Sequence, residues 1–225
     1  MEILIYFALI IILPIWASSR VKRTYKKYSK VQTTANMTGA EVAERILHEN
    51  GIYDVSVRPG KGFLSDHYNP RTKEIVLSPD NYHGMSVAGA AVAAHEVGHA
   101  IQDAESYAFL RLRHKLVPVA NLGSNFSFIL ILAGILLGSM QFMLGGIIFF
   151  AAAVLFQFVT LPVEFDASSR AMNQMVSTGL IRNEEEPHAK KVLNAAALTY
   201  VAAALVALLE LLRFILMFIG MNGDD

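Results

Sequence analysis

Uncharged positions are concentrated in the second half of the chain, where residues 116–163 contain no Asp, Glu, Lys, Arg or His. A helix that crosses a bilayer needs roughly 20 predominantly apolar residues, so this stretch is long enough for two. Gly138-Ser139-Met140-Gln141 offers a turn midway. The pattern predicts a transmembrane helical hairpin, about 118–139 and 141–163, because two helices of a soluble core would carry polar faces at helical spacing.

Two further apolar segments flank this hairpin. Residues 3–19 are uncharged and are followed by a basic cluster that begins at Arg20. A cleaved signal peptide carries its positive charge before the apolar core, so an uncleaved anchor is expected. The last segment, 193–219, is interrupted by Glu210 and Arg213. These residues lie three apart on one helix face, so they are expected to pair, with Arg213 reaching the far interface.

Basic residues predict the orientation of the four spans. Residues 20–117 and 164–192 fall on one side of the membrane, because the hairpin crosses and returns. They hold 18 of the 19 Lys and Arg residues. An excess of Lys and Arg marks the cytoplasmic side, so both segments are expected in the cytoplasm and the N-terminus outside.

Composition agrees with a membrane protein and excludes several other classes. Hydrophobic residues make up 54% of the 225 positions and charged residues 17%, against roughly 25% charged in soluble domains. The absence of cysteine excludes disulfides, thiol catalysis, Fe–S clusters and cysteine-ligated zinc. The 19 basic and 19 acidic residues balance, which gives no support for a nucleic-acid partner.

The segment before the hairpin has the pattern of a small α+β fold. Thr38 to Glu41 form a capping-box sequence that begins a helix, and Asn50-Gly51 ends it. Three short strand-like runs follow, and turn residues at Asn69–Thr72 join the last two into a predicted β-hairpin. A second helix is expected from about Ser86 to Ser106. The three runs are Tyr53–Arg58, Phe63–Tyr68 and Glu74–Ser78.

The second helix contains His95-Glu96-Val97-Gly98-His99. Its two histidines are four residues apart, so they project from one helix face and can bind the same metal ion. Glu96 lies beside them, where it can act as a general base on water. Zn²⁺ suits imidazole and carboxylate ligands and polarises a scissile carbonyl. The motif therefore predicts a zinc-dependent hydrolase.

A catalytic zinc needs a third protein ligand, and the spacing leaves several acidic residues open. Glu164 is favoured by topology, because it is the first charged residue after the hairpin and returns to the membrane side of His95 and His99. Asp103 lies one turn beyond His99 and is better placed for a hydrogen bond to a ligand. The full set of acidic candidates is Asp103, Glu105, Glu164, Asp166, Glu184, Glu185, Glu186 and Glu210.

Three segments resemble one family. Asp66–Arg71, Val92–Gln102 and Leu161–Ser168 resemble the bacterial YugP-type membrane zinc metallopeptidases, and more distantly the HtpX and CAAX-prenyl-protease class of gluzincins. The resemblance covers nearly the whole chain. It implies zinc held by His95, His99 and Glu164, with Glu96 as general base. In the distant class an alanine and an aspartate follow the glutamate, and the aspartate is the usual hydrogen-bond partner of a ligand. This chain has Ala167-Ser168 there, so serine replaces that aspartate.

The resemblance implies a mainly helical protein of the bacterial inner membrane, with about four transmembrane helices and a cytoplasmic zincin-like α+β portion that contains the H-E-x-x-H helix. Its predicted parts are an anchor, the catalytic portion, the hairpin, a cytoplasmic segment with the third ligand, and a final transmembrane helix (1–19, 20–117, 118–163, 164–192 and 193–220). The expected substrates are peptides or membrane proteins. The hairpin edge is expected to align an extended substrate by β-augmentation.

Other residues have weaker assignments. An oxyanion-stabilising group is expected, and Arg170, His188 and Tyr200 are the candidates. His67 and His83 are expected to be surface or structural histidines.

Two alternative functions differ in kind from this one. An intramembrane protease of the site-2 type would take a ligand from an Asp-Gly near a later span, and the chain has no Asp-Gly. A membrane scaffold or chaperone partner with a structural or vestigial zinc site would not need Glu96 beside the ligands.

Overall fold

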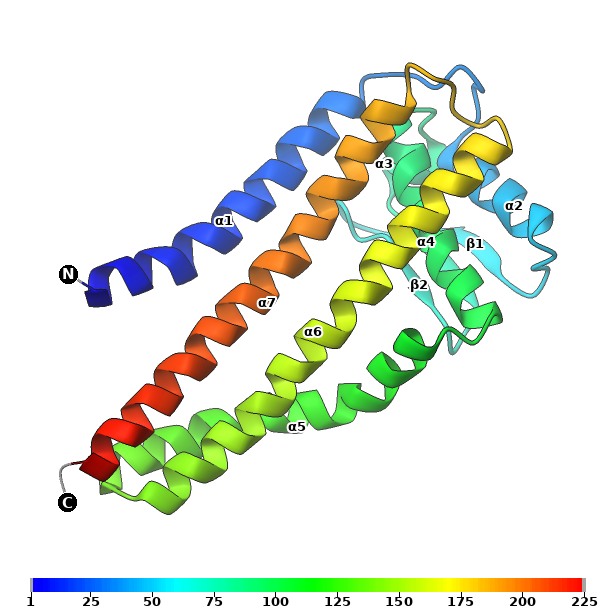
Figure 1. The fold of residues 1–225 in the computed structure, drawn as a ribbon. Coiled ribbons are helices and arrows are strands. Elements are labelled where there is room, and N and C mark those ends of the chain that lie inside the picture. The colour runs from blue at the N-terminus through cyan, green and yellow to red at the C-terminus, as the bar shows by residue number, and fades with distance from the viewer. Residues whose placement is uncertain (1, 224–225) are drawn as a thin grey trace. The chain divides into compact units, whose positions relative to one another are not determined.

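The computed structural model describes residues 2–223, and they are mainly helical (Figure 1). Among these residues, four helices are long and apolar enough to cross a membrane, which agrees with the four predicted spans. They are α1 (Glu2–Tyr28), α5 (Ala108–Leu137), α6 (Met140–Ser177) and α7 (Glu186–Gly223).

The chain divides into two compact units. The first, called the apolar unit, contains α5 from Arg111, α6 up to Pro162, α7 from Tyr200 and the start of α1 up to Ile15. Helices α5 and α6 run antiparallel to each other (Figure 1). Gly138 joins them with a φ of 61°, a conformation that glycine adopts without strain, so the predicted turn is confirmed.

Side chains of α5, α6 and α7 pack together in the apolar unit. Met143 is fully buried with Ile131 and Ile147, and the last turns of α7 pack against this cluster. The expected pair on α7 is also confirmed, because Arg213 donates to Glu210 at 3.0 Å. A paired arginine and glutamate cost less to bury than either charge alone.

The second unit, called the polar unit, contains Trp16–Leu110 and Val163–Thr199. It holds a three-stranded sheet in the order β1-β3-β2. β2 pairs antiparallel with β3, with His67 opposite Val76, which confirms the predicted hairpin. β1 pairs parallel with β3 on the other side. The strands are β1 (Ser56–Pro59), β2 (His67–Asn69) and β3 (Glu74–Leu77).

Three short helices complete the polar unit. α2 (Gly39–Glu49) has the predicted capping box, in which Thr38 accepts from the Glu41 amide and Glu41 accepts from the Thr38 amide. α3 (Pro79–His83) was not anticipated from the sequence. α4 (Val87–Ala104) matches the predicted second helix to within two residues at each end.

Helix α4 lies in the middle of the main hydrophobic core. Its small residues from Val87 to Ala94 are nearly all buried, which allows other elements to approach closely. The same core contains Ile46 of α2, Ile75 of β3 and Met175 of α6. The helix that carries the histidine motif is therefore held on several sides by packed elements.

Candidate metal centre

The two motif histidines are presented by α4. Ser86 caps this helix, because its hydroxyl accepts a hydrogen bond from the Gly89 amide at 3.0 Å. His95 and His99 lie one turn apart, with ring centroids 4.8 Å apart and ring planes at 80°. Glu96 lies between them in sequence and is also buried.

Glu164 completes a three-residue cluster from α6. Its Oε2 atom lies 3.3 Å from His95 Nε2 and 3.6 Å from His99 Nε2, and its side chain is 3% exposed. One ligand atom from each residue can be chosen so that all three lie within 4.8 Å of one another. Two partly buried imidazoles and a buried carboxylate therefore converge at one point.

The spacing of these atoms fits zinc. Ligand bonds to Zn²⁺ are about 2.1 Å long, and tetrahedral ligands at that length lie about 3.4 Å apart. The two distances from Glu164, 3.3 and 3.6 Å, are close to that value. The donor set of two nitrogens and one oxygen also suits a catalytic zinc, which keeps its fourth position for water or substrate.

Helices α4 and α6 approach closely beside the cluster because Gly98 has no side chain. A Cβ atom at this position would lie 2.5 Å from the Ala167 carbonyl oxygen and 3.1 Å from the Ala167 Cα. These are backbone atoms, which cannot rotate away. The glycine inside the motif thus sets the distance between the histidines and Glu164.

The second ring nitrogen of each histidine also has a partner. His95 Nδ1 lies 3.2 Å from Ser168 Oγ, and His99 Nδ1 lies 3.0 Å from Gln102 Oε1. If Nδ1 donates in both contacts, each Nε2 keeps its lone pair directed at Glu164. Hydrogen bonds of this kind orient metal-binding histidines and raise their basicity.

Gln102 is itself fixed by a chain of polar contacts. Its amide nitrogen donates at 2.8 Å to the Val163 carbonyl and at 2.8 Å to Asp166. Both amide hydrogens are therefore used, and the amide oxygen is left to accept from His99. Arg170 continues the chain, because it donates to Asp166 at 2.5 Å and to Glu105 at 2.6 Å.

Burial affects the acid–base properties of Glu96. Removal from water raises the pKa of its carboxyl group, because burial disfavours the charged form, while the charges of His95 and His99 oppose this shift. A carboxylate with a raised pKa is a stronger base toward water than an exposed one.

Several residues singled out in the sequence have other partners in the structure. Asp103, expected to bond a ligand, accepts from Tyr68 and Lys73 of the sheet region, while the adjacent Gln102 makes the bond to His99. Arg170, a candidate oxyanion group, is paired with two carboxylates. His188 stacks on Tyr28 at 4.8 Å.

The remaining candidates are distributed as follows. Glu185 accepts from the Thr34 amide and hydroxyl, and Glu210 pairs with Arg213 in the apolar unit. His67 lies on the exposed side of β2 beside the Ser65 carbonyl, and the ring of His83 packs edge-on against Tyr82. Tyr200 belongs to the apolar unit.

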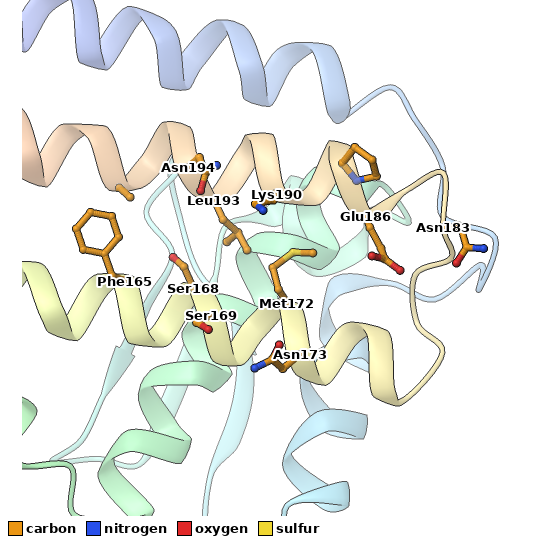
Figure 2. A pocket seen from close by; sticks show the side chains of 12 residues that line it. Phe165, Ser168, Ser169, Met172, Asn173, Asn183, Glu186, Lys190, Leu193 and Asn194 are labelled. Carbon is orange, nitrogen blue, oxygen red and sulfur yellow. The ribbon is translucent and has the colours of Figure 1, made fainter.

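A hollow of about 600 Å³ lies beside the cluster, between α6 and α7. Figure 2 shows Phe165, Ser168 and Met172 on α6 facing Leu193 and Asn194 on α7. Ser168 is shared, because it lines the hollow and contacts His95. Space for a substrate group is thus available one hydrogen bond away from a candidate ligand.

Two contacts at this centre were not predicted from the sequence, that of Gln102 with His99 and that of Ser168 with His95. Each had a usable signal in helical spacing. Gln102 follows His99 by three residues, and Ser168 follows Glu164 by four, so each shares a helix face with a candidate ligand.

Comparison with known proteins agrees with the histidine motif. The chain matches the family model “Putative neutral zinc metallopeptidase” over residues 3–219. It is 55% identical over 213 residues to “Putative membrane protease YugP” of Bacillus subtilis (strain 168). This match covers 95% of this chain and 94% of that protein. No solved structure is significantly similar. The protein therefore belongs to the neutral zinc metallopeptidase family described by that model, and its resemblance to YugP-type proteins is confirmed.

Proposed function

We propose that the protein is a membrane-embedded zinc endopeptidase that hydrolyses peptide bonds of membrane proteins or peptides. The observation that carries the proposal is the convergence of His95, His99 and Glu164, with spacings of 3.3 and 3.6 Å that suit tetrahedral zinc. These three residues would hold the ion. Zinc supplies Lewis-acid chemistry, because it polarises a carbonyl group and makes water more acidic.

Glu96 acts as the general base. It takes a proton from the attacking water as the water oxygen bonds to the carbonyl carbon, and it passes that proton to the leaving amine as the C–N bond breaks. The burial that raises its pKa matches this role, because a carboxylate with a raised pKa takes a proton from water more readily. Ser168 and Gln102 hold the two imidazoles in position through Nδ1.

The substrate lies along the β2 edge of the sheet. β2 pairs only with β3 among the described strands, so its other edge can accept an extended peptide by β-augmentation. Helix α4, which carries His95 and His99, packs against β2, so a peptide bound along β2 would lie close to the helix of the candidate ligands. Membrane proteins are favoured as substrates because the chain that carries the centre also carries four apolar helices.

Metal content and peptide cleavage, measured on the same purified samples, test this function. Glu96→Gln should keep zinc and lose cleavage, since the amide cannot accept a proton. Glu164→Ala should lose most of the zinc. Unchanged zinc in Glu164→Ala would reject the third ligand, and wild-type cleavage by Glu96→Gln would reject the general base.

The same experiment separates the enzyme from a scaffold with a structural zinc site. A scaffold would bind zinc in the wild type and show no cleavage that depends on Glu96. Glu44→Gln is a suitable control, because Glu44 is an exposed glutamate of α2 in the same polar unit.

A further inference from the structure

A second hollow in the polar unit is lined by basic side chains. Its volume is about 430 Å³, and it lies between the end of α1 and the start of α7. Arg20, Arg23 and Lys27 line it from α1, and Lys191 lines it from α7. No carboxylate lines it, and within residues 2–223 none of these four cations forms an ion pair.

The four cations are exposed, but they face one another across the hollow, unlike the charges of a single solvated helix face. Arg20, Arg23 and Lys27 follow one another at intervals of three and four residues, so they share the face of α1 that meets Lys191. Like charges on facing helices repel each other. Such an arrangement is stabilised by an anion between them.

The two walls of the hollow are held in place by neighbouring contacts. Tyr28 is buried and stacks on His188 of α7 at 4.8 Å. The Thr34 amide, just after α1, donates at 2.7 Å to Glu185, just before α7. The cations are therefore brought together before any ligand binds, which lowers the cost of binding.

The hollow lies where two apolar runs meet polar sequence. The uncharged run 3–19 ends at Arg20, and the last apolar run begins at Leu193, two residues after Lys191. Trp16 is 46% exposed with the Arg20 guanidinium 5.8 Å from its ring centroid, an arrangement typical of the membrane interface. Phospholipid phosphates lie at that level.

We propose that this hollow binds the phosphate of an anionic phospholipid headgroup. Arginine and lysine from two helices surround the phosphate. Asn194, which lines the hollow from α7 as Lys191 does, can donate to a headgroup oxygen. Trp16 and its apolar neighbours on α1 lie beside the acyl chains. The proposal is independent of the peptidase activity.

The test measures phosphatidylglycerol bound to the full-length protein in phosphatidylcholine nanodiscs, by native mass spectrometry over a range of low phosphatidylglycerol fractions. The variant Arg23→Gln/Lys191→Gln removes one cation from each wall. Binding should weaken about thirtyfold, at the usual contribution of each interfacial cation.

The matched control is Lys22→Gln/Lys26→Gln. It removes the same charge from positions of α1 that are exposed like Arg23 but do not line the hollow, and binding should change less than threefold. Equal losses in the two double variants would mean diffuse attraction and would overturn the proposal. If the first variant does not fold, Lys27→Gln alone should weaken binding about fivefold.

A competition arm separates lipid from free anion. Inorganic phosphate at millimolar concentration should leave the bound phosphatidylglycerol in place, because the lipid is also held by its chains. Displacement by inorganic phosphate, with the same dependence on Arg23 and Lys191, would identify a site for free phosphate and reject the lipid.

Discussion

At the scale of single residues, the contact of Gln102 with Nδ1 of His99 leaves Nε2 facing Glu164. Gln102→Leu removes the acceptor for Nδ1–H and leaves the Val163 carbonyl and Asp166 without this donor. Zinc affinity should fall by roughly 10- to 100-fold, the usual loss for a hydrogen-bond partner of a metal ligand. Competition with a zinc-binding dye measures it.

Gln174→Leu is the control for this change. Gln174 is also a partly buried glutamine of the polar unit, but its amide donates to Asn50, far in sequence from the candidate ligands. Zinc affinity should be unchanged there. Wild-type affinity in Gln102→Leu would show that Gln102 does not orient His99.

Ser168 allows a graded test of the partner of His95. Ser168→Ala removes one hydrogen bond and should weaken zinc binding about fivefold, in keeping with about 1 kcal/mol for a neutral hydrogen bond. Ser168→Asp supplies a charged acceptor and should bind zinc more tightly than the wild type. Release rates to a chelator should follow the order Ala, Ser, Asp, and any other order contradicts the contact.

The sequence was informative about residues whose spacing has a chemical meaning. His95, Glu96 and His99 were predicted from the motif, and Glu164 was favoured by topology and implied by the family resemblance. Asp103 was predicted to bond a ligand because it lies one turn beyond His99, whereas Gln102, also one turn away, makes this bond. The choice depends on rotamers and on Val163 and Asp166, which are distant in sequence.

At the scale of elements, the α4–α6 contact depends on Gly98. Gly98→Ala would place a Cβ 2.5 Å from the Ala167 carbonyl oxygen, so the helices must separate. Overpacking of this kind typically costs about 1–3 kcal/mol of unfolding free energy. The variant should melt at a lower temperature and lose zinc, because Glu164 moves away from both histidines.

Gly145→Ala is the matched control for Gly98→Ala. A Cβ there would lie 3.7 Å from Leu130, an ordinary contact, and alanine is the better helix former. Its melting temperature should be equal or higher, with zinc unchanged. If Gly98→Ala behaved in the same way, close approach at Gly98 would not control the metal centre.

Element ends were predicted less well than element types. The apolar run 3–19 predicted a helix that continues in the structure to Tyr28, and α6 continues to Ser177. The extensions are polar on one side but bury Tyr25, Tyr28, Ala171 and Met175 in the core of the polar unit. Hydropathy detects membrane helices, while these extensions are stabilised by tertiary packing.

At the scale of the whole molecule, the placement of the motif favours one kind of protease over another. His95 and His99 lie on α4, which is not among the four helices found to be apolar and long enough to span a membrane. A site-2-type enzyme would carry its motif on a span. We therefore expect the proposed peptidase to cleave outside the bilayer core, on chain segments that leave the membrane.

The orientation of the whole molecule is predicted from its charges. With 18 of 19 Lys and Arg residues in 20–117 and 164–192, the polar unit is predicted in the cytoplasm. Alkaline phosphatase, which is active only outside the cytoplasm, should be inactive when fused after Lys30 and active when fused after Ser139, in the turn between α5 and α6. The opposite pattern would reverse the topology and place the metal centre outside, where its substrates would be different proteins.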